Sequence, residues 1–363
     1  MMKVNFLTGD LIFRKNKTGV HVVHTKIFEK CSTDKDLCSV LSFYRSKREF
    51  LSEHGLNKHF HYDMKFSNQL CKILMYFVPV RWIFGDADIY FCDGIVPITR
   101  KIRVCIIHDL MVFRYPENYS FVMRWYLKFY FWRTKKADKI ITVSKSTRDD
   151  IMHYLKIPQE KIVVVNLGYE ATDRVEVLRE NGTENEKYLI YVGAFRENKN
   201  LNRAIQGFAH YIKKYNDDEL CFFIVGSGNS RELKKLSVSL GIEEKVHFFG
   251  YISDKERDDL YKNAYACLFV SVFEGFGIPI LEAMSYGIPV ITSNVSSMKE
   301  IGENYAILVD PLSVESIADG IARLRDETTR EWYVKKSKQR IKNYSWEKTY
   351  QCVKKVFFDV LKS

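Results

Sequence analysis

The sequence predicts two doubly wound, Rossmann-like α/β domains in series. Short apolar runs of strand length alternate with helical patterns along most of the chain. The alternation stops in a polar stretch at 171–187 and then starts again. The length of 363 residues also exceeds the roughly 250–300 residues at which one core usually stops growing, so two domains are expected.

The first predicted domain, 1–170, contains four apolar runs that are typical of strands. They lie at 3–7, 104–107, 139–143 and 161–165. A helical pattern at 147–155 separates the last two runs. Alternating strands and helices favour a parallel sheet that is covered by helices on both faces.

The second predicted domain, 171–343, contains five such runs, and a final segment at 344–363 follows it. The runs lie at 188–192, 220–225, 246–249, 266–270 and 289–292, with helical patterns at 200–215 and 253–264. Ligands of doubly wound sheets bind beyond the carboxyl ends of the strands. We therefore expect the site in a cleft where the two domains face each other.

The composition is that of an ordinary globular protein. With 46% hydrophobic and 28% charged residues, the chain is not typical of disorder, collagen or a coiled coil. The eight cysteines form no C-x-x-C pair and no zinc spacing, so we expect reduced thiols and no metal. The most apolar later stretch, 73–84, contains Arg81 and is too short to span a bilayer, and the start does not resemble a signal peptide. We therefore expect a cytoplasmic protein.

The positive charge is concentrated in the first half of the chain. Residues 1–170 carry 28 Lys and Arg against 17 Asp and Glu, which equals the whole net charge of +11, whereas 171–363 carry 28 of each. This asymmetry indicates an anionic partner for the first half, either a membrane surface or nucleic acid. Because no nucleic-acid recognition fold is evident, we expect no nucleic acid.

The segment 121–136 combines aromatic and basic residues at unusual density. It holds two Trp, two Tyr, three Phe and five cations in 16 residues. As a helix it is expected to bury one aromatic face and leave others partly exposed. Since Trp and Tyr favour the bilayer interface and Lys and Arg favour anionic lipid, we expect peripheral contact with an anionic membrane. The alternative is a core helix with a solvated basic face.

The stretch 271–284 combines a strand end, a glycine-rich turn and a helix start. Glu274 lies on the turn and Glu282 about one turn into the helix, where both carboxylates are able to accept hydrogen bonds from sugar hydroxyls. The helix start, with Pro279 in its first turn, favours anions and oxygen-rich ligands. The alternative is a plain strand–turn–helix with one capping Glu. The backbone donors expected at this start belong to Gly275, Phe276, Gly277 and Ile278.

A second candidate follows the strand at 188–192. The strand ends in Gly193, and Arg196 and Lys199 lie three residues apart at a helix start. Two cations at that spacing are able to grip a diphosphate, Arg by its fork and Lys as a point charge. The alternative is a solvated basic helix start.

Together these stretches resemble retaining glycosyltransferases of the GT-B fold, family 4 (group 1). Glu274 and Glu282 match the family's E-x7-E motif, in which the first Glu contacts the donor sugar and the second the nucleotide ribose. Arg196 and Lys199 match its R-x-x-K-N element, which stabilises the leaving diphosphate. Catalysis then consists mainly of positioning and of stabilising the departing charge.

The resemblance assigns roles to further residues. His108, which follows the run 104–107, matches a His that contacts the donor sugar near the reaction centre, although a lone His there is more often structural. Gly19 matches a glycine that lets backbone approach the phosphates, but this loop carries one Gly where many relatives have two. Gly226 matches the glycine turn near the nucleotide, and Tyr251 lies in the base-side loop. The resemblance also implies that 344–363 is a helix that crosses back to the first domain.

The implied activity is retaining transfer of a hexose from a nucleotide sugar, with no metal required. The implied acceptor is lipid-linked or an oligosaccharide, in bacterial surface polysaccharide synthesis such as that of lipopolysaccharide. The Glu-Gly-Phe-Gly-Ile-Pro version of the motif favours mannose, and GDP-mannose over a UDP-sugar. The alternatives are a UDP-sugar-dependent glucosyl- or N-acetylhexosaminyl-type transferase and a sugar-nucleotide epimerase of the same fold. A non-catalytic glycan-assembly partner is disfavoured by the intact Glu and Arg/Lys pairs.

Overall fold

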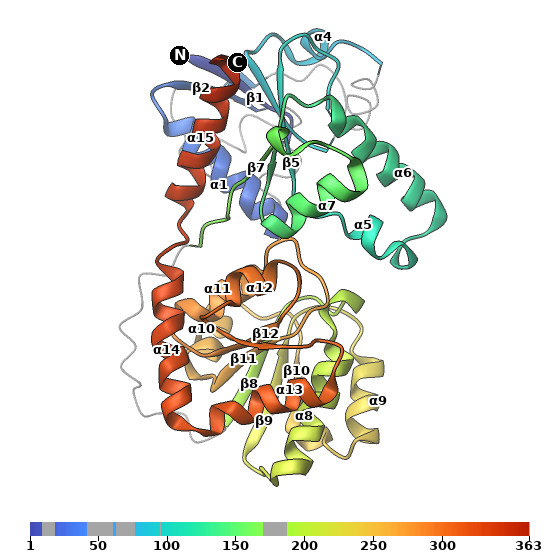
Figure 1. Cartoon of the computed structure of the whole chain (residues 1–363), viewed down its shortest axis with the longest axis vertical. Helices are drawn as coiled ribbons and strands as arrows, with labels where there is room; N and C mark the ends of the chain where they lie inside the picture. Colours follow the sequence, from blue (N-terminus) through green and yellow to red (C-terminus); the bar gives the residue numbers. More distant parts are fainter. Residues whose placement is uncertain (9–18, 42–60, 63–76, 95, 170–186, 363) are drawn as a thin grey trace. The chain divides into compact units, whose positions relative to one another are not determined.

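A computed structural model describes residues 1–8, 19–41, 61–62, 77–94, 96–169 and 187–362. The chain divides into two compact units, shown in Figure 1. Unit 1 comprises Met1–Gly168 together with Ser345–Ser363, and unit 2 comprises Tyr169–Tyr344. The segment expected at 171–187 to link the domains lies almost entirely outside the described residues.

Unit 1 is built on a parallel sheet in the order β3-β2-β1-β4-β5-β6-β7. The order reverses between β1 and β4, as a doubly wound sheet requires. Three of these strands, β2, β3 and β4, were not predicted. The strands are β1 (Met2–Phe6), β2 (Leu37–Leu41), β3 (His61–Tyr62), β4 (Ile89–Asp93), β5 (Ile102–Ile107), β6 (Lys139–Thr142) and β7 (Ile162–Val164).

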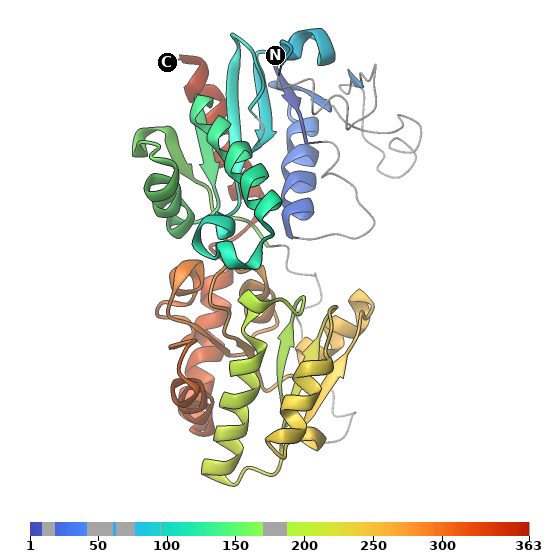
Figure 2. The ribbon, with the colours of Figure 1, turned by 90° about the vertical axis from the view of Figure 1, so that its right-hand side faces the viewer.

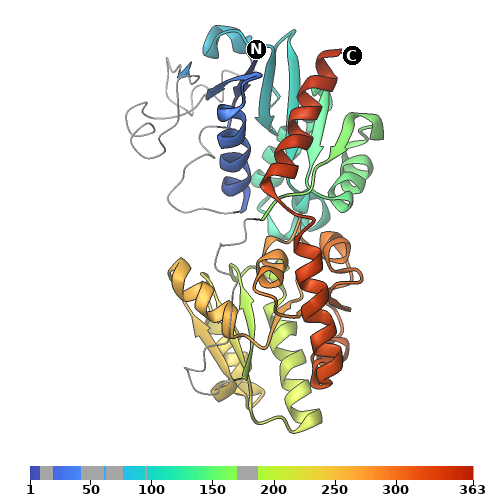
Figure 3. The same cartoon turned by 90° about the vertical axis from the view of Figure 1, so that its left-hand side faces the viewer.

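The helices of unit 1 include α1, near the start of the chain, and α15, which follows unit 2 in the sequence. The helix α15 packs beside α1, as Figure 3 shows, and it buries Trp346, Tyr350 and Phe357. The ring of Phe357 meets that of Phe91 on β4 edge-on, with centroids 5.7 Å apart. The helices are α1 (Gly19–Thr33), α4 (Val80–Phe84), α5 (Met111–Arg114), α6 (Phe121–Trp132), α7 (Lys145–Leu155) and α15 (Trp346–Lys362), with 3₁₀ turns at Pro116–Asn118, Arg133–Lys136 and Gln159–Lys161.

Unit 2 is built on a second parallel sheet in the order β10-β9-β8-β11-β12-β13. The order reverses between β8 and β11, so the segments that follow these two strands leave the same edge of the sheet side by side. All five predicted strands are present, and only the three-residue β13 was not predicted. The strands are β8 (Lys187–Val192), β9 (Leu220–Val225), β10 (Val246–Phe249), β11 (Ala266–Phe269), β12 (Val290–Ser293) and β13 (Ile307–Val309).

The helix α8 packs an apolar face against the sheet of unit 2, where the ring of Phe208 lies 5.7 Å from that of Phe222 on β9. In α8, Leu201, Ile205, Phe208 and Ile212 are buried at the three- and four-residue spacing of one helical face. Figure 2 shows α8 running alongside the sheet. The helix α13 packs against α8. The helices are α8 (Leu201–Tyr215), α9 (Arg231–Ser239), α10 (Asp254–Asn263), α11 (Ile278–Ser285), α12 (Ser296–Gly302), α13 (Val314–Ala322) and α14 (Glu327–Ile341), with 3₁₀ turns at Glu197–Lys199, Glu243–Lys245 and Arg323–Arg325.

The two sheets confirm the predicted fold class of two Rossmann-like α/β domains. Among the described helices, none combines the length and the apolar character that crossing a bilayer requires.

Candidate active site

The candidate site of unit 2 lies on the two segments that leave the neighbouring strands β8 and β11. The segment after β8 carries Gly193, Arg196 and Lys199, and the segment after β11 carries Glu274 and the start of α11. Because β8 and β11 are adjacent at the reversal of strand order, these segments meet where doubly wound sheets bind ligands.

Lys199 and Glu274 form an ion pair across these two segments. The Lys199 ammonium donates to Glu274 Oε1 at 2.7 Å. The two side chains are only 15% and 13% exposed, and the ammonium lies 5.2 Å from the centre of the Phe269 ring. A largely buried pair is screened little by water, so each charge strongly orients the other. The sequence predicted a separate role for each residue, and the structure joins them.

Two asparagines lock the Lys199 segment onto the segment after β11. Asn198 accepts from the backbone N–H of Val272 at 2.9 Å through its backbone carbonyl, and its side-chain amide donates to the carbonyl of Phe273 at 3.1 Å. Asn200 donates to the carbonyl of Val270 at 3.0 Å and to that of Pro311 at 2.7 Å. Both asparagines are buried, and sequence reasoning gave neither of them a role. The available signal was the R-x-x-K-N element, whose last residue is Asn200. In the structure Asn200 has a φ of 60°, which Asn adopts more readily than most residues.

The backbone of Glu274 is held from the other side by two serines. The hydroxyls of Ser296 and Ser297, at the start of α12, donate to the Glu274 carbonyl at 2.8 and 2.9 Å. These two residues were also missed, since only the return of the chain after β12 brings them to this loop. The contacts fix the loop from which the Glu274 carboxylate extends.

Glycine is required where the strand ends of unit 2 approach one another. Gly226, directly after β9, has a φ of 146°, and a Cβ there would lie 1.9 Å from the carbonyl oxygen of Gly193. The predicted glycines 193 and 226 therefore pack backbone against backbone. At the start of α11, Gly277 has a φ of 110° in the N-cap position, and Pro279 lies in the first helical turn.

Glu282 has surroundings quite different from those of Glu274. It is half-buried on α11, where the Tyr261 hydroxyl donates to its Oε2 at 3.3 Å. Burial raises the pKa of Glu282, and the nearby charge of Arg257 only partly opposes this. The structure shows no contact between the side chains of Glu282 and Glu274.

The remaining predicted residues of unit 2 divide into exposed and buried groups. The Arg196 side chain is exposed at the start of a 3₁₀ turn and makes no ion pair with a described residue. Tyr251 is 92% exposed. Phe276 is buried, and its ring meets that of Tyr344 at 6.0 Å, so its side chain belongs to the core. Ile278 begins α11, one residue after Gly277.

In unit 1, the predicted His108 lies directly after β5 within a cluster of three polar side chains. Its Nε2 lies 3.2 Å from Nε2 of His24, which extends from α1 and is 1% exposed. His24 Nε2 lies 3.6 Å from Oδ2 of Asp93, at the end of β4. His24 and Asp93 were not predicted, although Asp93 directly follows a strand. The other predicted residue, Gly19, begins α1 and is exposed, and the rest of its loop lies outside the described residues.

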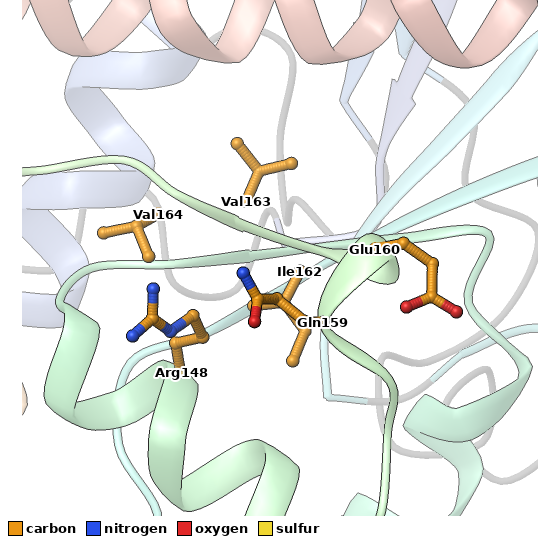
Figure 4. A pocket seen from close by; sticks show the side chains of 6 residues that line it. All are labelled: Arg148, Gln159, Glu160, Ile162, Val163 and Val164. Carbon is orange, nitrogen blue, oxygen red and sulfur yellow. The ribbon is translucent and has the colours of Figure 1, made fainter.

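A hollow of about 540 Å³ in unit 1 contains none of the predicted residues. Figure 4 shows the side chains that line it beside α7 and β7. Its one cation, Arg148, is already paired with Asp149 at 2.8 Å. None of the predicted site residues therefore lines this hollow.

Comparison with known proteins identifies the family. The model of "Glycosyl transferases group 1" matches residues 173–345, and that of "Glycosyltransferase Family 4" matches residues 38–172. O-antigen chain mannosyltransferase RfbU of Salmonella typhimurium is 29% identical over 246 residues, which cover 65% of this chain and 67% of the relative. O-antigen chain mannosyltransferase B of Escherichia coli is 27% identical over 282 residues, which cover 73% of each.

A solved structure supports the fold independently. Anabaena Alr3699/HepE, in a complex with UDP and glucose, matches with a TM-score of 0.71 and 15% identity over 99% of this chain and 100% of its own. At that identity the likeness concerns the fold alone. The two family models show that the chain belongs to the group 1, family 4 glycosyltransferases, and the structural match supports the GT-B type of fold.

Proposed function

We propose that this chain transfers a hexose, with mannose favoured, from a nucleotide sugar to a lipid-linked or oligosaccharide acceptor in bacterial surface polysaccharide synthesis, with retention of configuration. The observation that carries the proposal is the buried ion pair of Lys199 and Glu274 at the strand ends of unit 2. In our proposal Lys199 supplies the cation for the diphosphate and Glu274 supplies the carboxylate for the sugar hydroxyls.

In this proposal the two charges of the pair divide the work. The Lys199 ammonium has three N–H donors, and Glu274 occupies one of them, so two remain for phosphate oxygens. The exposed Arg196 adds a second cation. Both stabilise the negative charge that develops on the leaving diphosphate, and such electrostatic stabilisation usually contributes most to the rate of a reaction of this kind. Glu274 accepts hydrogen bonds from the sugar and holds it in position.

The other predicted residues complete the proposed donor site. Glu282 accepts hydrogen bonds from the nucleotide ribose, and Tyr251 lies near the base. His108 contacts the donor sugar. The backbone at Gly19, Gly193, Gly226 and from Gly275 to Ile278 approaches the donor closely, because small residues or helix starts leave N–H groups accessible there. No metal is required for these contacts.

GDP-mannose is the favoured donor because both relatives reported above are named mannosyltransferases. A UDP-sugar is the second candidate, favoured by the solved complex of the Anabaena protein with UDP and glucose. A thermal-shift screen with GDP, UDP, GDP-mannose and UDP-glucose separates the two. Stabilisation by GDP and GDP-mannose alone supports the first proposal, and stabilisation by the uridine compounds alone supports the second.

The reaction itself is tested by NMR of the donor during incubation. With a glycan or glycolipid acceptor, the anomeric signal of the product gives the configuration, and an inverted anomer would contradict retention. Isomerisation of the donor sugar without any acceptor would instead identify an epimerase.

We also propose that α6 binds the surface of an anionic membrane. The structure exposes large apolar side chains along this helix instead of burying a full face, and no residue of α6 is fully buried. Lys128, Lys135 and Lys136 are exposed on or just after it. The exposed apolar side chains are Phe121, Val122, Met123, Trp125, Tyr126, Phe129 and Trp132.

The helix is nevertheless fixed to unit 1, so it presents these side chains as a rigid surface. Ser120 caps its start, and Tyr130 and Phe131 pack against the core. Just beyond its end, buried Arg133 donates to the carbonyl of Val96 at 3.1 Å. Aromatic side chains beside lysines suit the interface of a bilayer that carries negative lipid.

Vesicle flotation tests this proposal. The protein is expected to float with vesicles of phosphatidylcholine and phosphatidylglycerol but not with phosphatidylcholine alone. The double variant Trp125→Ser, Phe129→Ser is expected to lose most of this binding. Replacing the exposed Trp332 of unit 2 by Ser serves as the control, and equal flotation of all three proteins would contradict the role of α6.

A further inference from the structure

The cluster of His24, Asp93 and His108 in unit 1 combines groups from three different elements. His24 comes from α1, Asp93 ends β4 and His108 follows β5, and β4 and β5 are neighbouring strands. The backbone around the cluster is also fixed. The Tyr130 hydroxyl donates to the Asp93 carbonyl, and the Thr147 hydroxyl donates to the His108 carbonyl at 3.4 Å. A cluster held this firmly is expected to have one defined arrangement of protons.

Two histidines and a carboxylate are also a common set of metal ligands. One ligand atom from each residue lies within 4.8 Å of the others. However, Nδ1 of His24 is buried and has no partner among the described residues. If Nε2 of a neutral His24 bound a metal, the ring proton would lie on that buried Nδ1 without an acceptor, whereas metal-bound histidines almost always donate this proton. The geometry therefore favours a hydrogen-bond network over a metal centre.

The same unpartnered atom decides which ring donates. A buried N–H without an acceptor is costly, so the proton of His24 belongs on Nε2. That nitrogen also faces the Asp93 carboxylate at 3.6 Å, which favours a proton there. His24 Nε2–H therefore donates to His108 Nε2 at 3.2 Å. Since His108 accepts at Nε2, its own proton must lie on Nδ1.

Nδ1 of His108 is the ring nitrogen of this pair that is able to donate to a ligand. It forms no hydrogen bond with a described residue, and His108 is only partly buried, whereas His24 is 1% exposed. Burial, together with the neighbouring His24, lowers the pKa of His108 to about 4 although Asp93 opposes this, so the ring is neutral at pH 7. Burial alone would raise the pKa of Asp93, but the interactions with His24 outweigh it and hold that pKa below its ordinary value.

We propose that His24 is a positioning residue which, supported by Asp93, holds neutral His108 in the Nδ1–H tautomer and so offers that N–H to an oxygen of the donor sugar. The last step of this inference rests on the proposed function. The tautomer itself does not, because it is a property of the free protein.

Two matched variants test the role of His24. In His24→Gln the side-chain amide carries an N–H close to the position of Nε2, whereas His24→Met has similar length and no donor. Long-range ¹H–¹⁵N NMR of protein labelled at histidine distinguishes the two tautomers. His108 is expected to be in the Nδ1–H form in the wild type and in His24→Gln, and to shift toward the Nε2–H form in His24→Met. His153, on α7, serves as the unchanged reference.

Three results would overturn the proposal. The first is an Nε2–H tautomer of His108 in the folded wild type. The second is an unchanged tautomer in a folded His24→Met. The third is stoichiometric displacement of both His24 and His108 signals by Zn²⁺ or Mn²⁺ added to protein stripped with a chelator, since this would identify a metal site.

Activity provides the link to the donor. With GDP-mannose or UDP-glucose, whichever raises the melting temperature, kcat is expected to fall about tenfold in His24→Met, with KM nearly unchanged, and to recover in His24→Gln. Equal kcat in both variants would contradict the proposal that His108 donates its Nδ1–H to the donor sugar. A correct tautomer in a protein that binds and transfers neither donor would instead contradict the proposed function and leave the tautomer intact.

Discussion

Within each unit a polar contact joins two segments near the strand ends, and the two contacts differ in kind. In unit 2, Lys199 and Glu274 join full charges at 2.7 Å. In unit 1, His24 and His108 join two rings at 3.2 Å and leave one buried nitrogen without a partner among the described residues. The same sheet geometry therefore fixes a charge in one unit and a proton position in the other.

The largest effect is expected when the charge pair of unit 2 is broken. Lys199→Met removes the buried cation and leaves Glu274 without its partner, so transfer is expected to fall about 10²–10³-fold. Initial rates with saturating donor measure this loss. In the double variant Lys199→Met, Glu274→Gln, the loss is expected to be smaller than the product of the single losses, because the two residues act as one unit.

A matched control is available in the same unit. Lys214 also pairs with a carboxylate, that of Asp319 at 3.0 Å, but both side chains are well exposed on the helices α8 and α13. Lys214→Met is expected to retain the wild-type rate. A similar loss in both lysine variants would show that the effect of Lys199 is not specific to the site.

Acidification is expected to weaken the strand ends of unit 1. The pKa of His108 is lowered from 6.5 to about 4 by burial, so the folded state resists its protonation. Its contribution to stability is therefore complete above pH 6.5 and is lost as the pH falls toward 4, by on the order of 3 kcal/mol in full. Hydrogen exchange of peptides from β5 at pH 7 and pH 5, corrected for the intrinsic rate, measures this loss. His108→Gln is expected to abolish the difference, and a persistent difference would assign it to another group.

The close approach of backbones in unit 2 is expected to tolerate no side chain. Gly226→Ala places a Cβ 1.9 Å from the Gly193 carbonyl, so the strand ends must separate, and unfolding is expected to become easier by about 1–3 kcal/mol. Thermal melting with and without the nucleotide measures both stability and binding. Gly250→Ala is the control, because its Cβ meets nothing within 4 Å. Equal melting temperatures for the two variants would contradict the close packing.

The smallest effect is expected at Glu282. Its contribution to stability changes with pH in the opposite direction to that of His108. Because burial raises the pKa of Glu282, its contribution to stability is present below its ordinary pKa and is lost as the pH rises. At pH 7, Glu282→Gln is therefore expected to stabilise the nucleotide-free protein by about 0.5–1 kcal/mol while weakening nucleotide binding. Urea unfolding and titration with the nucleotide measure the two effects. Replacing the exposed Glu303 by Gln should change neither.

The sequence allowed much of unit 2 to be predicted, because its signals are local. The strands β8, β9 and β10 are continuous apolar runs that end in glycine or lead into turns, and Glu274 and Lys199 lie in the short segments that follow strands. The pairing of these two residues was beyond prediction. It depends on β8 and β11 being neighbours, which is a property of sheet order and not of either segment.

Unit 1 was harder to predict for the same physical reason. β2 is separated from β1 by a long helix, and β4 follows a stretch in which strand and helix patterns are difficult to distinguish. His24 and His108 are 84 residues apart, and only the packing of α1 on the sheet brings them together. A histidine on the buried face of a helix was the available signal, but burial alone does not indicate a partner.

The placement of α15 also has a consequence for how the chain is made. Unit 2 is contained within one continuous stretch of chain, whereas unit 1 needs Trp346, Tyr350 and Phe357 to complete its core. During synthesis from the amino end, residues 169–344 therefore leave the ribosome, ready to fold, before unit 1 has its last helix. The apolar surface beside α1 stays uncovered throughout that interval. The first unit to be translated is thus the last to be finished, and a chaperone that shields α1 would assist it most.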